Sequence, residues 1–87
     1  MNKGYVFGGV ADDNLSPVST FPWVCKVVDF FIFDNDIVVE YTSDGLNWIV
    51  VFIPADSFYS IDFDCVSVRW VNAIPGAVAI YQIVGYA

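Results

Sequence analysis

The side chains best suited to chemistry in this sequence are carboxylates that gather at predicted turns. Asp34 and Asp36 place oxygen atoms at alternate positions, as calcium loops do, but the glycine and the later glutamate of such loops are missing. Asp62 and Asp64 have the residue types of a glycoside hydrolase pair, without a supporting motif elsewhere. Asp also favours turns because it hydrogen-bonds its own backbone. We therefore expect no catalytic residue, no metal site, no cofactor and no enzymatic activity.

Histidine is absent from all 87 residues. This removes imidazole metal ligands, Ser-His and Cys-His nucleophile pairs, and ordinary imidazole proton transfer. The two thiols, Cys25 and Cys65, each lie in an apolar or strand-edge context. We expect both to be reduced and structural rather than bridged.

The segment VEYTSDGLNW, residues 39–48, contains the residue types of a sugar-binding loop. Asp44 and Asn47 offer hydrogen bonds, and Trp48 offers an aromatic face. The same segment fits a plain β-hairpin, because its Asp-Gly dipeptide is a strong turn signal between two apolar runs. In that hairpin Trp48 would pack across from Tyr41. A ligand loop formed by Asp44, Asn47 and Trp48 is the alternative to a purely structural turn.

Arg69 is the one arginine, and it lies in the strand-like segment VSVRW. Its guanidinium has two interpretations. It can pair with a carboxylate of a neighbouring strand, such as Glu40 or Asp62. It can also contact another subunit, because arginine is favoured at protein interfaces.

The overall composition is apolar and acidic. Of the residues 57% are hydrophobic and 18% aromatic, and the formal net charge is −7 with three cations. So few cations argue against binding to nucleic acid backbones or to acidic membrane surfaces. No apolar run approaches the roughly 18 residues of a membrane helix. A single small domain cannot bury this much apolar surface, so we expect exposed apolar patches and association with other chains.

The strand signals are dense, and helical spacing is absent. Val, Ile and aromatic residues dominate, and turn signals recur about every 8–12 residues. The sequence therefore predicts an all-β fold, an antiparallel β-sandwich of the jelly-roll or Ig-like type with six to seven strands in a meander-like order. The expected strands cover residues 23–33, 37–42, 48–53, 57–63, 66–71 and 77–86. In the second of these, Ile37, Val39 and Tyr41 lie on one face. The segments DND, PADS, DFDC and NAIPGA are expected turns or connections.

Residues 1–22 differ from the remainder of the chain. They hold half of the six glycines and two of the four prolines. They could form one short strand around Tyr5–Val10, but we predict an N-terminal arm over residues 1–22 and a β-sandwich domain over residues 23–87. The arm would order against a neighbouring protein through its apolar side chains. The expected partner-binding residues are Tyr5, Val6, Phe7, Val10, Leu15 and Phe21, together with Arg69.

Residues 26–87 resemble the small β-sandwich modules of tailed-phage virion proteins, such as capsid decoration proteins, head fibres and tail adhesins. The hairpin EYTSDGLNW, the segment IPADSFYSIDF, the strand with Arg69 and the terminal YQIVGY carry this resemblance. The family carries no catalytic residues.

The resemblance implies a bacteriophage structural protein, namely a decoration or cement subunit that binds the major capsid protein and stabilises the head. It implies a homo-oligomer, with a trimer favoured, located on the capsid surface. The segment MNKGYVFGGV lacks the apolar core of a secretory signal, so we expect synthesis in the host cytoplasm. The alternative is a carbohydrate-binding receptor-recognition module of a head fibre or tail adhesin. Neither nucleic acid nor a membrane is an expected partner.

Overall fold

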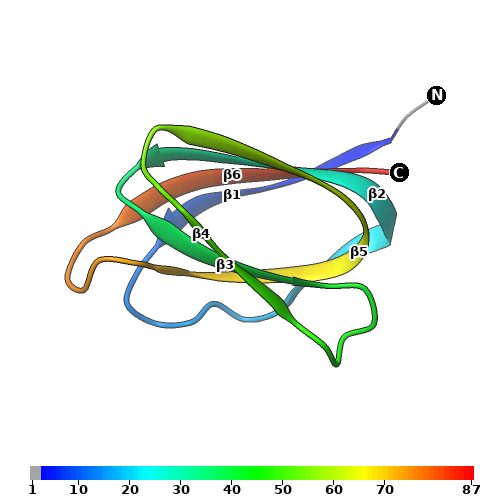
Figure 1. Cartoon of the computed structure of the whole chain (residues 1–87), viewed down its shortest axis with the longest axis horizontal. Helices are drawn as coiled ribbons and strands as arrows, with labels where there is room; N and C mark the ends of the chain where they lie inside the picture. Colours follow the sequence, from blue (N-terminus) through cyan, green and yellow to red (C-terminus); the bar gives the residue numbers. More distant parts are fainter. Residues whose placement is uncertain (1–2) are drawn as a thin grey trace.

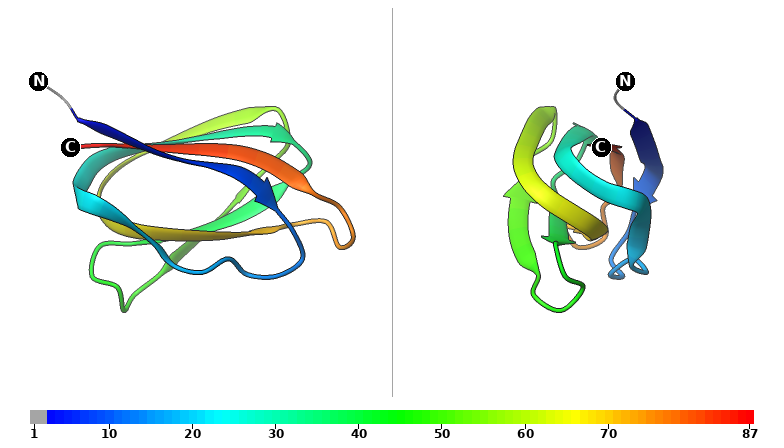
Figure 2. Two further views of the ribbon diagram at one scale, coloured as in Figure 1. Left: turned by 180° about the vertical axis from the view of Figure 1, so that it is seen from behind. Right: turned by 90° about the vertical axis from the view of Figure 1, so that its right-hand side faces the viewer.

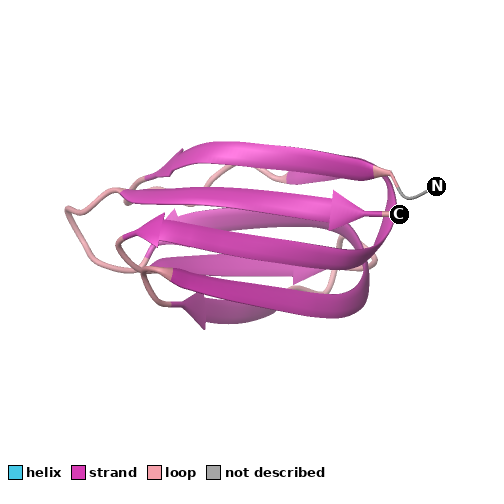
Figure 3. Ribbon diagram, turned by 90° about the horizontal axis from the view of Figure 1, so that it is seen from above, coloured by secondary structure: helices cyan, strands magenta, loops and turns pink. Residues whose placement is uncertain are grey.

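The computed structural model describes residues 3–87, which form six strands joined by loops, with no helix in this range (Figures 1 and 3). The strands are β1 (Gly4–Ala11), β2 (Ser19–Asp34), β3 (Ile37–Thr42), β4 (Ile49–Ile53), β5 (Ser57–Asn72) and β6 (Ala79–Tyr86). Every paired strand is antiparallel to its neighbour. The predicted all-β antiparallel class is confirmed.

The six strands belong to one sheet in the order β1-β6-β2-β5-β3-β4. Residues 3–87 contain no second sheet, so the two-sheet arrangement of the expected sandwich is not seen. The predicted meander is wrong, because only β3 and β4 are neighbours both in the sequence and in the sheet. The other pairings are long-range, and they leave β1 and β4 as the two edges.

The sheet rolls up because its two longest strands bend together. β2 and β5 pair from Ser19 opposite Val68 to Ile32 opposite Ser57, with register shifts on both sides of Cys25, which lies opposite Cys65. Such irregularities bend a strand and increase its twist. Figure 2 shows β2 and β5 curving from one layer into the other. The segment DFDC, predicted to be a connection, therefore lies inside a continuous β5.

The core fills the space between the two layers of this rolled sheet. Phe7 contacts Phe21 with ring centroids 5.0 Å apart, and Trp70 contacts Tyr81 with centroids 4.6 Å apart. The predicted alternation of β3 is confirmed, since Ile37, Val39 and Tyr41 are all buried. The other buried hydrophobic residues are Ala11, Phe21, Cys25, Val28, Phe30, Ile32, Ile53, Ile61, Cys65, Val68, Trp70, Ala79, Tyr81 and Ile83.

The predicted N-terminal arm is corrected by the structure. Residues 4–11 form β1, which pairs along its whole length with β6 of the same chain. Ala11 and Phe21 lie in the core, and the predicted domain boundary between residues 22 and 23 falls inside β2. Tyr5 and Phe7 point inward and Val6 and Val10 outward, so the glycine-rich segment still has the two-residue period of a strand.

Gly85 supplies the space that the bend of β2 requires. A Cβ atom at this position would lie 2.5 Å from Cys25 Sγ and 2.5 Å from Phe21 Cε1. We expect Gly85→Ala to lower the free energy of unfolding by about 1–3 kcal/mol, because overpacking displaces core side chains. Urea denaturation followed by circular dichroism measures the change.

Gly8→Ala is the matched control, because its Cβ would make only an ordinary contact of 3.7 Å with the Tyr81 carbonyl oxygen. A Gly85→Ala protein as stable as the Gly8→Ala protein would show that Phe21 and Cys25 do not pack on β6 as described.

Candidate functional site

A group of exposed and partly exposed apolar side chains lies on the outside of the layer formed by β1, β6 and the adjoining halves of β2 and β5. Strand alternation directs these side chains away from the core. We call this surface the outer face. Its apolar residues are Val6, Val10, Ile80, Val84, Phe31, Phe33 and Phe58. Val10, Phe33 and Phe58 are 60%, 52% and 57% exposed. Such patches mark protein contact surfaces.

A groove of about 310 Å³ lies at one end of the outer face. Phe31, Phe33 and Phe58 line it together with Ile32, Asp56 and Ser57. The Phe31 and Phe58 rings are 5.0 Å apart and come from opposite positions on β2 and β5. An aromatic groove beside a carboxylate can accept an apolar side chain next to a cationic group.

The polar atoms of the hairpin loop between β3 and β4 hydrogen-bond to one another. The Asp44 carboxylate accepts hydrogen bonds from the backbone N–H groups of Leu46 and Asn47, both at 2.8 Å, from Thr42 Oγ1 and from Asn47 Nδ2. These bonds, led by the one from the Asn47 N–H, hold the pKa of Asp44 well below its usual range. The predicted ligand loop thus places Asp44 and Asn47 against each other rather than toward an open site.

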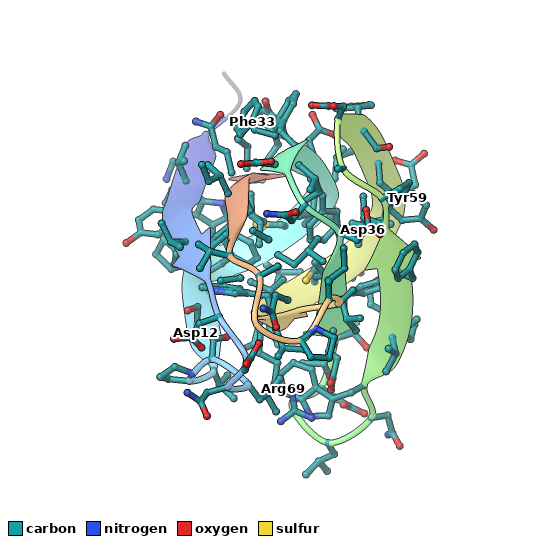
Figure 4. The ribbon with its side chains drawn as sticks, turned by 90° about the vertical axis from the view of Figure 1, so that its left-hand side faces the viewer. Asp12, Phe33, Asp36, Tyr59 and Arg69 are labelled. Atoms are coloured by element: carbon teal, nitrogen blue, oxygen red, sulfur yellow. The ribbon has the colours of Figure 1, made fainter. Side chains whose placement is uncertain are left out.

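Trp48 lies outside β4 and does not face Tyr41, whose partner is Ile49. Instead, Arg69 Cζ lies 4.0 Å from the centroid of the Trp48 ring. Arg69 also donates to Glu40 Oε1 from Nε at 2.9 Å and from Nη2 at 2.7 Å. The predicted pairing with a strand carboxylate is confirmed, with Glu40 as the partner. Figure 4 places Arg69 on the opposite side of the molecule from Phe33.

The acidic candidates for chemistry also make contacts within the fold. Asp36 Oδ1 accepts from the Ala55 N–H at 2.8 Å, and Asn35 Nδ2 donates to the Val78 carbonyl oxygen at 2.7 Å. Asp64 forms an exposed ion pair with Lys26 at 3.0 Å. Residues 3–87 contain no cluster of three or more metal-ligating side chains. Over the same range, no helix has the length and apolar character to cross a membrane.

The predicted partner-binding residues do not form one surface. Val6 and Val10 join the outer face, whereas Leu15 is exposed on the loop after β1. Tyr5 is partly exposed but faces the Phe7 and Phe21 rings, Phe7 is half-buried and Phe21 is only 4% exposed. Phe21 is therefore a core residue and presents no side chain to a partner. The sequence reasoning missed Phe33, Phe58 and Ile80. The available signal was the alternation along residues 28–33. Phe30 lies on one face of β2, and Phe31 and Phe33 lie on the other, so both faces carry aromatic side chains.

A second cavity, of about 330 Å³, lies between the end of β1, the loop that follows it, and β5 and β6. Trp70 and Tyr81 form its aromatic wall, and Asp12, Asn14 and Ser16 are polar residues of its lining. No described residue hydrogen-bonds the Tyr81 hydroxyl, and burial raises the pKa of this group. The cavity has the volume of a small ligand site.

The two cysteines are free and buried, opposite each other on β2 and β5. Burial raises the pKa of Cys65 from 9.0 to about 11. The folded chain therefore keeps this proton to higher pH than the unfolded chain, so the associated stability is fully present below about pH 9 and is lost as pH rises to about 11.

We expect the free energy of unfolding of the Cys65→Ala protein to decrease less between pH 9 and pH 11 than that of the wild type, as measured by urea titrations. An unchanged slope would assign the fall to other groups.

Arg69 is expected to stabilise the fold through its contacts with Glu40 and Trp48. Its pair with Glu40 is largely shielded, with side-chain exposures of 25% and 18%, whereas Lys26 and Asp64 are 66% and 63% exposed. Arg69→Leu should lower the free energy of unfolding by about 1–2 kcal/mol through loss of the ion pair and of the Trp48 contact. Lys26→Leu, the matched control, should change it little. Equal effects of the two changes on thermal unfolding would contradict this role.

Comparison with known proteins adds no relative. No protein-family model matches the chain, and no curated protein is significantly similar to it. The proposed function therefore rests on the outer face, the groove and the loops, together with the sequence resemblance over residues 26–87.

Proposed function

We propose that this chain is a structural subunit of a tailed-phage virion, a decoration or cement protein that docks on the head through its outer face. The observation that carries the proposal is the exposed aromatic groove formed by Phe31, Phe33 and Phe58. Solvent-exposed aromatic side chains that border a groove gain free energy when a partner covers them. The sequence resemblance over residues 26–87 supplies the virion context.

The charge distribution defines the chemistry of the partner. Asp34 and Asp56 lie next to the groove, and the chain carries −7 overall. A docking surface on the major capsid protein would therefore combine an apolar side chain with lysine or arginine at its rim. The rolled sheet gives the chain two packed layers, which is the layering that a β-sandwich module of this family would have.

A carbohydrate-binding module is the second candidate, and the cavity beside Trp70 and Tyr81 favours it. Aromatic side chains next to carboxylate, amide and hydroxyl groups are what a sugar ring requires. Trp70 and Tyr81 are only 8% and 6% exposed, however, so the open aromatic face is small. The hairpin loop contributes less to this function, since its polar groups bind one another.

The composition of the virus particle tests the proposed role. Quantitative mass spectrometry of purified particles should detect this chain at a copy number comparable with that of the major capsid protein. A few copies per particle would favour the adhesin alternative, and absence from the particles would refute the virion proposal.

Two phenylalanines with equal exposure allow a sharp test of the docking surface. Phe58 on the outer face and Phe52 on β4 are each 57% exposed. We expect Phe58→Asp to weaken binding to particles that lack this protein by at least tenfold, about 1.4 kcal/mol. Phe52→Asp should bind like the wild type in the same co-sedimentation assay. The outer face is not the docking surface if the two variants bind equally well.

A further inference from the structure

Strand β1 is an unprotected edge of the sheet. Its eight residues, GYVFGGVA, contain no charge and no proline, and they pair with β6 without a register shift. Natural edge strands are usually short, charged, bulged or interrupted by proline, because an unprotected edge pairs with other strands. The opposite edge, β4, is only five residues long and is followed by Pro54.

The direction of the backbone groups shows which residues are available at this edge. The Ala87 N–H donates to the Lys3 carbonyl oxygen at 2.9 Å, one step beyond the pairing of Gly4 with Tyr86. In an antiparallel ladder this bond places the odd-numbered residues of β1 in hydrogen-bonded pairs with β6. The even-numbered residues therefore direct their N–H and C=O groups away from the sheet. These residues are Gly4, Val6, Gly8 and Val10.

The two ends of β1 carry opposite charges. Lys3 precedes the strand, and Asp12 and Asp13 follow it. Lys26 and Arg69 both have carboxylate partners, whereas Lys3 has no ion pair within residues 3–87 and its Nζ lies 5.5 Å from the centroid of the Trp23 ring. An antiparallel copy of the same strand would bring Lys3 of each chain to the acidic end of the other.

We propose that β1 pairs with β1 of a second copy of this chain, antiparallel and around a two-fold axis at Gly8, so that the two sheets become continuous. This register pairs the outward-directed backbone groups with one another. It places Val6 opposite Val10 of the second copy on the outer face, and Lys3 opposite Asp13. A register centred on Phe7 would instead place Lys3 opposite Ala11 and lose the charge pairing.

The partner at β1 is a second copy of this chain. Two chains that each carry a charge of −7 repel each other when other parts of their surfaces come close. β1 and its neighbour β6 contain no acidic residue, so pairing at this edge keeps most carboxylates apart. The interface closes with two copies, because it joins identical surfaces. It does not depend on the virion role, since the groove at Phe58 lies three strands away from this edge.

Native mass spectrometry of the full chain at micromolar concentration tests the interface. The wild type should be a dimer that dissociates on dilution. Gly8→Lys should be a folded monomer, because two lysines would face each other at the axis, while its Cβ makes only an ordinary contact of 3.7 Å. Gln82 lies on β6, opposite Gly8 of β1. Gln82→Lys therefore places the same charge on the outer face, one strand away from the edge, and this variant should remain dimeric.

Further variants test the register and the charges. Gly8→Cys should form a covalent dimer under mild oxidation, since paired Cα atoms in such a ladder lie about 5.5 Å apart. Gln82→Cys should not, and the native thiols are buried. Lys3→Glu should raise the dissociation constant roughly threefold to tenfold. Adding Asp12→Lys, which changes the charge next to Asp13 at the acidic end of β1, should restore it. Asp13 itself is kept because it accepts hydrogen bonds from Asn72 and Gly76.

A monomeric wild type, a trimeric wild type, or the absence of a Gly8→Cys cross-link would each overturn the proposal. Phe58→Asp should dimerise normally, so that failure of the edge interface and failure of the docking surface give different results.

Discussion

The architecture depends on the point at which β2 and β5 bend together. Before the bend, β2 directs Phe21 and Cys25 inward; after it, the inward residues are Val28, Phe30 and Ile32. The inward set thus changes from odd to even positions, and β5 makes the same change between Cys65 and Val68. The register irregularities at Cys25 allow both halves of each strand to face one core. Without this change, one half of each strand would turn its apolar side chains to solvent.

Rolling a single sheet leaves two edges, which a closed barrel does not have. The two layers hide their inner faces against each other, but the outsides of both layers and the two edges remain uncovered. In this sequence the outside of β2 is itself aromatic, with Phe31 and Phe33 alternating with the buried Phe30 and Ile32. Of the sixteen exposed large hydrophobic residues within residues 3–87, eleven lie on strands, where the backbone fixes their position. A rigid apolar surface loses little conformational entropy when a partner covers it.

Local patterns predicted the local features correctly. The alternation of Ile37, Val39 and Tyr41 gave the buried face of β3, and the Asp-Gly dipeptide gave the hairpin turn. Asn35 and Asp56, which lie in segments expected to turn, adopt positive φ angles of 58° and 56°. The long-range features were not accessible. The pairing of β1 with β6 joins the two ends of the sequence, and no local pattern records it. The continuity of β5 was missed because Asp62 and Asp64 are turn formers that here point to solvent from a bent strand.

The loops and the surfaces of the molecule have different roles. Asp36 and Asp44, which sequence patterns suggest as ligands, accept backbone hydrogen bonds that fix the turns, and Asp13 likewise receives bonds from Asn72 and Gly76. Fixed turns hold the strand ends in place, and the strands in turn set the shape of the outer face. Acidic residues remain around this face while the edge strand is neutral. The two proposed contacts would therefore select different partners: a cationic surface at the groove, and a second copy of the chain at β1. Because the groove lies on β2 and β5 and not on β1, both contacts could form on one molecule.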